Sequence, residues 1–387
     1  MFDIIQSLFV YIGLGLSLYL LGRVASQRQI ANFQVGHRLT FWNWEIVASL
    51  ALFALVSGVR WNVGVDHLSY LREYLHAQAY GTTIKDFEIG FKLLTQGMAL
   101  LGFHYAFYFG LLAFLQLFCI YQTFKDERYL LPYVGLTVVL GFHYLSWMNG
   151  IRQMLAATIF LFSIQFIVRR KLAPFVSMIV LASLFHMSSL MLLPLYLLPN
   201  KDFLNNRLLV AIASVFFFYI GMDPNWIALV EKYMSLVIGW LGYEGYSENI
   251  SHFIEQSEGA SFGPRMFSIF LLYALVIFYS PLLKKNFFNT NFIIYYKIYI
   301  IGFLLYCLFV NSHHIFLRPI TYLTICSIPV ISYFLVYLSR RPKKYAALFA
   351  IVLVLACAYT PLSVVADYGL GERDYSNYRI FLFNDNR

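Results

Sequence analysis

The chain has 387 residues, of which 60% are hydrophobic and only 12% are charged, and its mean hydropathy is +0.67. Soluble globular proteins carry about 25% charged residues, so this composition excludes a water-soluble fold. The net charge of +9 does not indicate a nucleic-acid partner, because the basic residues lie in short loops between apolar runs, where they orient membrane helices. The four cysteines all lie in apolar stretches, which excludes a zinc site or a disulfide framework.

Apolar runs of about 20 residues predict helices that cross the membrane. The first run has no basic segment before it and no small-residue cleavage site after it, so we interpret it as a span and not as a signal peptide. The predicted spans are residues 2–22, 40–58, 94–121, 129–147, 151–168, 208–222, 265–283, 291–310, 316–338 and 345–365. We therefore expect an all-α polytopic membrane protein, with residues 1–387 as a single transmembrane domain of about ten full spans.

The basic residues predict the orientation of the chain. Loop 23–38 carries three arginines and no acid, so it is expected on the cytoplasmic side, which places the N-terminus outside. Alternation then puts 59–93 outside and the basic residues 169–171 inside. Both the N- and the C-terminus are expected to be extracytoplasmic.

The stretch 172–199 decides the orientation of everything after it. As a single span it would place the acidic segment 223–264 inside and the lysines 284–285 outside, and both placements violate the positive-inside rule. If it enters the membrane and returns, all later loops obey the rule. We therefore predict a broken re-entrant hairpin with its turn near residues 185–187, which is tolerated only where protein or a wet cavity surrounds it.

Two long outer segments, 59–93 and 223–264, mix apolar and charged residues and are predicted to lie on the outer surface as amphipathic helices and loops. Ionisable side chains gather at the outer ends of the spans. They are Arg60, Asp66, Glu88, Arg152, His186, Arg265 and Arg318. Polar groups near the hydrocarbon usually face a bundle interior or a cavity, and a cavity lined by arginines suits an anionic lipid headgroup.

Each of these residues also has a purely structural interpretation. Arg60 could extend to the headgroups, and Asp66 could cap the next helix. Arg152, which follows Asn149-Gly150, could likewise extend to the headgroups. It lies in the first turn of a helix, however, where the macrodipole disfavours a cation, and this position hints at a nearby anion. A lone His186 in an apolar run is more often a hydrogen-bonded structural residue than a base.

Several chemical motifs are absent from the sequence. It contains no phosphate-binding glycine loop, no His-Glu-x-x-His, no nucleophile elbow and no paired acidic motif for a divalent metal. We expect no cofactor and no metal, and any reaction must use an already activated donor.

Taken together, five segments resemble the EpsG family of bacterial exopolysaccharide membrane proteins, regarded as Wzy-type polysaccharide polymerases, which also make O-antigen. The matching pieces are Arg60 to Tyr70, Glu88-Ile89-Gly90-Phe91, Asn149 to Gln153, Leu181 to Ser189, and Arg318 before a tyrosine-containing span. Each motif is weak alone, but their order and spacing form a fairly specific set.

The resemblance implies a GT-C-like glycosyltransferase in the bacterial inner membrane. Such an enzyme would move a glycan from undecaprenyl diphosphate onto the terminal sugar of another lipid-linked repeat at the outer face, with no metal. The expected partners are the undecaprenyl-diphosphate-linked oligosaccharide, the lipid bilayer and a chain-length regulator, and no nucleic acid is expected.

The outer residues fit that chemistry, since arginines would stabilise the charge that builds on a leaving diphosphate. We assign this role to Arg152 and Arg318, with Arg60 assisting. Asp66 and His186 are the candidate bases, and Glu88 is expected to orient the acceptor or the base. The expected substrate-binding residues are Trp61, Tyr70 and Gln153.

Other functions stay open. A ligase-type transferase would use the same donor and the same arginines without chain growth. A transporter or flippase of lipid-linked sugars would also use broken helices and buried charge, but it needs a site reachable from both faces. In a structural subunit of a synthesis complex, the polar residues would be incidental.

Overall fold

The computed structural model describes residues 2–34, 40–226, 228–229, 232–233, 263–312, 314–368 and 376–380. The predicted outer segment 223–264 falls mostly outside these residues. In the described part of the chain the regular elements are all helical, with one isolated antiparallel bridge between Arg60 and Ile380. The chain is therefore an all-α protein, as predicted.

The described residues form the following helices, in chain order. They are α1 (Phe2–Gln34), α2 (Trp44–Gly58), α3 (His67–Tyr80), α4 (Ile89–Leu100), α5 (Tyr105–Thr123), η1 (Arg128–Leu130), α6 (Leu131–Leu140), α7 (Tyr144–Asn149), α8 (Ile151–Val168), α9 (Leu172–Ser183), η2 (Met187–Leu197), α10 (Arg207–Gly221), α14 (Pro264–Asn286), α15 (Phe292–Leu308), α16 (His314–Thr324), α17 (Ser327–Ser339), α18 (Pro342–Cys357) and α19 (Tyr359–Asp367).

The number of full spans is smaller than predicted. Five helices of the described residues are long and apolar enough to cross a membrane, or six if α18 and α19, bent by 45°, form one span. The expectation of about ten full spans is not met, because other apolar helices such as α2 and α10 have only 15 residues. At 1.5 Å per residue such a helix covers about 22 Å, less than the hydrocarbon thickness of about 30 Å.

The predicted span 94–121 is wrong. The chain breaks after α4, where Gly102 adopts a φ of +70°, and the spanning helix is α5. Helix α4 packs on α3 instead, and Tyr74 of α3 donates a hydrogen bond of 2.7 Å to the Phe103 carbonyl in the connection. One face of α4 is buried against α3, so the residues of α4 are also apolar and the apolar run continues across the break. Hydropathy alone therefore does not reveal the break between α4 and α5.

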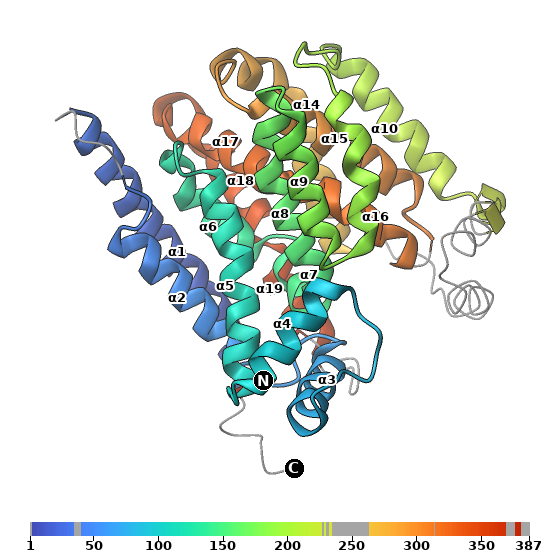
Figure 1. The fold of residues 1–387 in the computed structure, drawn as a ribbon. Helices are drawn as coiled ribbons and strands as arrows, with labels where there is room; N and C mark the ends of the chain where they lie inside the picture. The colour runs from blue at the N-terminus through green and yellow to red at the C-terminus, as the bar shows by residue number, and fades with distance from the viewer. Residues whose placement is uncertain are drawn as a thin grey trace.

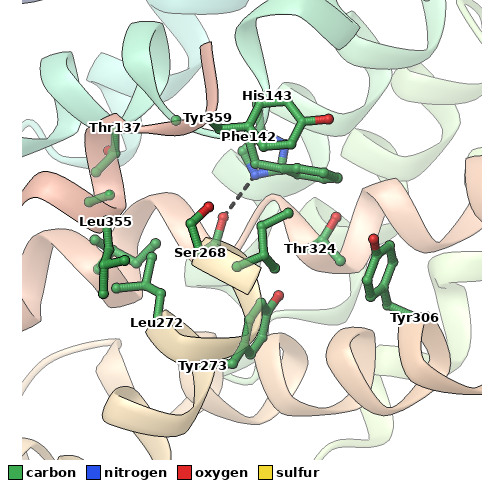
Figure 2. Close-up of a pocket in the computed structure, with 15 residues that line it drawn as sticks. Thr137, Phe142, His143, Ser268, Leu272, Tyr273, Tyr306, Thr324, Leu355 and Tyr359 are labelled. Carbon is green, nitrogen blue, oxygen red and sulfur yellow. Dashed lines mark hydrogen bonds between the residues drawn. The ribbon is translucent and has the colours of Figure 1, made fainter. Parts of the chain in front are cut away.

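The predicted span 129–147 is also broken, at Gly141–His143 between α6 and α7. A cavity of about 40 Å³ adjoins this break and is lined by hydroxyl groups and by His143, whose Nε2 lies 2.8 Å from Ser327 Oγ (Figure 2). This volume has room for a few waters at about 10–15 Å³ each. Polar groups at this depth are thus held inside the bundle and away from lipid.

The bundle has two distinct ends. At one end, which we call the basic end, the loops that were predicted to be cytoplasmic contact one another: Gln29 bonds the Asp126 carbonyl, Lys284 pairs with Asp202, and Arg341 bonds Asn286. At the other end lie α3 and α4, the N-terminus and residues 376–380 (Figure 1). The predicted alternation therefore groups the loops correctly; which end faces the cytoplasm stays a prediction.

Residues 172–199 double back, as predicted. Arg170 donates hydrogen bonds of 3.0 and 2.7 Å to the carbonyls of Tyr196 and Leu198, so the start of α9 and the end of η2 lie side by side. The return arm η2 is an 11-residue 3₁₀ helix with Pro194 inside it. Since 3₁₀ runs longer than about four residues are uncommon, this arm is held by its neighbours more than by its own hydrogen bonds.

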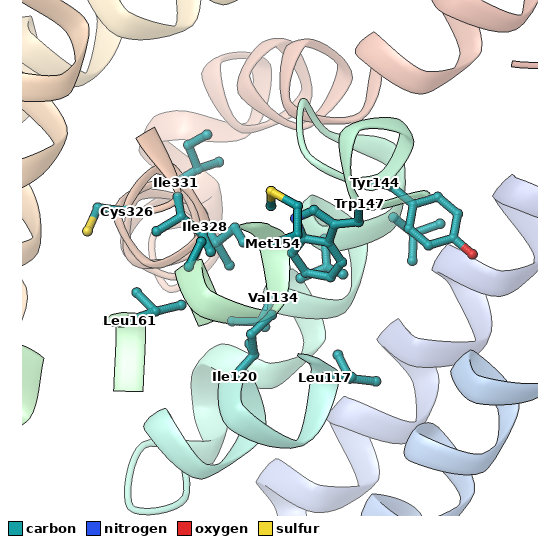
Figure 3. Packing of buried hydrophobic residues seen from close by; sticks show 14 of the residues in the cluster. Leu117, Ile120, Val134, Tyr144, Trp147, Met154, Leu161, Cys326, Ile328 and Ile331 are labelled. Carbon is teal, nitrogen blue, oxygen red and sulfur yellow. The ribbon is translucent and has the colours of Figure 1, made fainter. Parts of the chain in front are cut away.

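Two central elements, α8 and the α16–α17 segment, carry the packing core. In the most apolar part of each element, 78% of the residues of α8 and 94% of those of the α16–α17 segment are buried. Side chains of α5 and α6 interdigitate with them, as Ile120, Val134 and Met154 do in Figure 3. These two buried elements place Arg152 and Arg318 at the end of the bundle that carries α3 and α4.

Candidate active site

The centre of the site is an ion pair between the first residues of two helices. Glu88 is the N-cap of α4 and Arg152 lies in the first turn of α8, and Glu88 Oε2 accepts a hydrogen bond from Arg152 Nη1. Their side chains are only 18% and 23% exposed. The guanidinium also lies over the Phe87 ring at 4.6 Å. Glu88 is thus the anion that the unfavourable helix position of Arg152 indicated.

The tip of the hairpin is tied to the same carboxylate. Glu88 Oε1 accepts a hydrogen bond of 3.1 Å from the Met187 backbone N–H. The backbone N–H groups of Gly90 and Phe91, at the start of α4, donate to the Leu184 carbonyl at 2.9 and 3.2 Å. Both carboxylate oxygens of Glu88 therefore accept hydrogen bonds, one from Arg152 and one from the hairpin tip. Glu88 thus positions Arg152 and the hairpin tip relative to each other.

His186 lies at the hairpin tip in a network of hydroxyl groups. Its Nδ1 is 2.7 Å from Ser188 Oγ and 3.2 Å from the Tyr322 hydroxyl, and these two oxygens are 3.1 Å apart. The pKa of His186 is lowered to about 4, mainly by burial; Glu88 opposes this shift, and Arg152 and Arg318 add to it. The imidazole is therefore neutral at physiological pH and can accept a proton.

Arg318 completes the cationic side of the site. It is exposed and its guanidinium makes no ion pair with the described residues, while its backbone carbonyl accepts a hydrogen bond from Gln153 Nε2. Arg318 lies one helical turn before Tyr322 on α16, so both face the hairpin tip.

Tyr70 and Asp66 approach the site from α3. Arg152 Nε donates a long hydrogen bond of 3.5 Å to the Tyr70 hydroxyl. Burial raises the pKa of Tyr70, and Asp66 raises it as well, which places the Asp66 carboxylate in the same electrostatic environment. Asp66 is the N-cap of α3, but its side chain makes no capping bond, so the carboxylate remains available for a substrate.

Three predicted residues do not join this cluster. Arg60 is 3% exposed and its guanidinium donates to the carbonyls of Ser57 and Met148, so it holds the backbone together. The Trp61 ring packs edge-on to His67, and its backbone N–H donates to the Arg379 carbonyl. Arg265 pairs with Asp367 on α19.

Sequence reasoning missed two members of the cluster, Ser188 and Tyr322. Tyr322 was covered only as part of a tyrosine-containing span, although its spacing of four residues from Arg318 places both on one helix face. Ser188 could have been found from its position two residues after His186, a spacing at which a serine hydroxyl can reach a neighbouring side chain.

At one end of the bundle the arrangement provides two guanidinium groups, a neutral imidazole and, beside Tyr70, the Asp66 carboxylate, which forms no ion pair with the described residues. Arginine forks bind phosphate oxygens in pairs, and the imidazole and the carboxylate are both groups that can take a proton. In the described part of the chain no three His, Cys, Asp or Glu side chains lie together as metal ligands would. The site therefore suits an anionic substrate and a proton transfer.

Comparison with known proteins gives one result. The model of a family described as EpsG family matches residues 43–380, a range that includes every residue of the cluster. The comparisons with curated proteins and with solved structures gave no match. The GT-C-like architecture that the resemblance implied therefore has no support from a structural relative.

Proposed function

The chain belongs to the EpsG family, and on that premise we propose that it is a membrane glycosyltransferase that polymerises lipid-linked oligosaccharide repeats. Family membership and the apolar helices indicate a membrane protein of polysaccharide synthesis. The donor in this proposal is an oligosaccharide on undecaprenyl diphosphate, and the acceptor is the terminal sugar of a second lipid-linked repeat. The reaction takes place at the outer face of the bacterial inner membrane.

The observation that carries the proposal is the exposed Arg318 beside the Glu88–Arg152 pair. An exposed guanidinium that has no carboxylate partner among the described residues, next to a second arginine, is suited to a diphosphate. Negative charge grows on this diphosphate as the glycosidic bond breaks, and preorganised cations stabilise that charge. In this scheme Arg318 contacts the diphosphate first. Arg152 then also binds the diphosphate, while Glu88 holds the Arg152 guanidinium in its orientation.

The bond changes balance without a cofactor. A hydroxyl oxygen of the acceptor forms a bond to the anomeric carbon of the donor, and the bond from that carbon to the diphosphate oxygen breaks with both electrons going to the leaving group. The hydroxyl proton passes to His186 or Asp66, the two groups of the cluster that can receive it. Tyr70 is buried against Phe87 and Phe91 with its hydroxyl 3.5 Å from Arg152 Nε, so in this scheme it supports the guanidinium and does not stack on a sugar ring.

The test is the replacement of Arg318 by glutamine, with Arg72→Gln as the matched control. Arg72 is an exposed arginine on α3 at the same end of the bundle. Purified protein in lipid nanodiscs is incubated with lipid-linked repeat alone, and products are separated by length. We expect a ladder of polymer with the wild type and with Arg72→Gln, and a reduction of at least about 100-fold with Arg318→Gln, the loss typical of removing one preorganised charge-stabilising group.

Three other outcomes would contradict the proposal. A wild-type rate in Arg318→Gln would remove the diphosphate role. A product with a single added block from the wild type would indicate a ligase-type transferase. Movement of the unchanged lipid-linked repeat across a liposome membrane, without a new glycosidic bond, would indicate a transporter.

A further inference from the structure

An apolar groove of about 530 Å³ lies between α10 and α14, and none of its lining residues belongs to the candidate active site. It exists because small residues face each other there: Ala211 and Ser214 on α10, and Ala274 on α14. Phe218 and Phe303 are among its aromatic walls. This volume falls in the range of about 300–1,000 Å³ that is typical of ligand sites.

The helix that forms one wall of this groove is turned toward lipid. Leu209, Val215 and Tyr219 of α10 are 64%, 71% and 78% exposed, and only three residues of α10 are buried. An apolar groove on an apolar, lipid-facing helix matches a hydrocarbon chain.

The mouth of the groove at the basic end is cationic. The exposed Arg207 begins α10, donates to the Phe278 carbonyl at 3.1 Å, and makes no ion pair with the described residues. The carboxylate of this region, Asp202, is already paired with Lys284 at 2.8 Å. Lys284 also bonds the Leu204 carbonyl, which joins the end of α14 to the loop before Arg207. Among the described residues that line the groove, Arg207 is the one that carries a charge, so the mouth is positive.

We propose that this groove binds one acidic glycerophospholipid of the leaflet at the basic end. An acyl chain occupies the space along Ala211 and Ala274, and the headgroup phosphate binds Arg207. Basic pockets between membrane helices recognise anionic headgroups in this way, and arginine grips phosphate with two parallel hydrogen bonds. The lipid would fill the space that the small residues leave between α10 and α14.

The test measures lipid retention by native mass spectrometry of the full chain, offered phosphatidylglycerol and phosphatidylcholine with identical acyl chains at equal concentration. We expect the wild type to retain phosphatidylglycerol about fivefold better, the factor that corresponds to about 1 kcal/mol from the one basic residue Arg207. Arg207→Gln should reduce this preference to near unity. Arg340→Gln, an exposed arginine at the same end that lies over Tyr129, should keep it.

A second pair of variants tests the groove itself. Ala274→Phe fills the groove and should lower the retention of both lipids, whereas Ala350→Phe, at an exposed alanine of α18, should not. Equal retention of the two lipids by the wild type, or an unchanged preference in Arg207→Gln, would overturn the proposal. The readout is binding, so a protein without polymerase activity would still give a clear answer.

Discussion

Arg152 at the start of α8 is a cation at a helix position that favours anions, and its contacts with Glu88 at the start of α4 account for this placement. The unfavourable interaction of Arg152 with the helix dipole is offset by its ion pair with Glu88 and its contact with the Phe87 ring. Glu88 gains Arg152 and the Met187 N–H. This pair couples three segments that are distant in sequence, so its removal should affect both stability and activity.

Replacing Glu88 by glutamine should destabilise the protein by about 1–3 kcal/mol. Breaking a buried pair costs about 3–5 kcal/mol, and we expect less here because each side chain keeps about a fifth of its surface exposed. Asp86→Asn is the control, since the Asp86 side chain is 95% exposed in its ion pair with Lys92. Thermal unfolding of the two variants in the same detergent measures the difference, and equal midpoints would contradict the positioning role of Glu88.

The pH dependence of the rate should report the state of His186. Its pKa is lowered to about 4, so the neutral form that accepts a proton persists as the pH falls through the ordinary histidine value of 6.5 and is lost only near pH 4. The initial rate of polymer formation should therefore stay flat from pH 8 to pH 6. Arg318→Gln removes a charge that lowers this pKa, so any residual activity should decline at a higher pH than in the wild type. An acid limb centred at pH 6.5 in the wild type would contradict this placement of His186.

For single residues, the sequence predicted which side chains belong to the candidate site better than it predicted their contacts. The structure brings Glu88, Arg152 and His186 together and places Arg318 and Tyr70 beside them. It turns Arg60 inward, where the guanidinium donates to the carbonyls of Ser57 and Met148. That inward turn depends on how α7 approaches the end of α2, which local sequence does not encode.

Among the elements, α4 and the hairpin tip approach so closely that a glycine is needed between them. A Cβ at Gly90 would lie 2.8 Å from both the Cβ and the carbonyl oxygen of Leu184. Gly90 thus allows α4 to receive the Leu184 carbonyl at its N-terminus, and the tip then holds His186 in place. The positive-inside rule predicted that the chain turns back here, but not that α4 is the element that contacts the turn.

Gly90→Ala should lower both the unfolding midpoint and the rate of polymer formation, because the hairpin tip must move away and the two bonds to the Leu184 carbonyl lengthen. Gly97→Ala is a control in the same helix, where an added Cβ meets nothing within 4 Å. An alanine inside a helix is favoured over glycine by about 0.5–1 kcal/mol, so Gly97→Ala should be neutral or stabilising. Equal behaviour of the two variants would show that the contact with the hairpin tip is not needed.

Across the whole molecule, charge distribution proved a better guide than the length of apolar runs. The positive-inside rule grouped the loops into two ends correctly, since Lys284, Asp202 and Arg170 all bond within one end. The length of apolar runs overestimated the number of full spans, because some runs, such as the one that forms α6 and α7, contain a break that tertiary contacts stabilise. Beside that break, the Thr360 hydroxyl donates to the carbonyls of Val139 and Gly141. Such a break is tolerated inside a bundle but not against lipid.

The absolute orientation can be tested with single cysteines at the two ends. Thr82 is exposed in the connection between α3 and α4, and Asn289 is exposed between α14 and α15 at the basic end. In a background with the four native cysteines replaced by serine or alanine, a membrane-impermeant maleimide added to intact spheroplasts should label Thr82→Cys and not Asn289→Cys. Inverted membrane vesicles should give the opposite pattern. The lipid-linked donor is proposed to react outside, so labelling of Thr82→Cys from the cytoplasmic face alone would place Arg152, Arg318 and His186 on the wrong side of the membrane and remove the polymerase proposal.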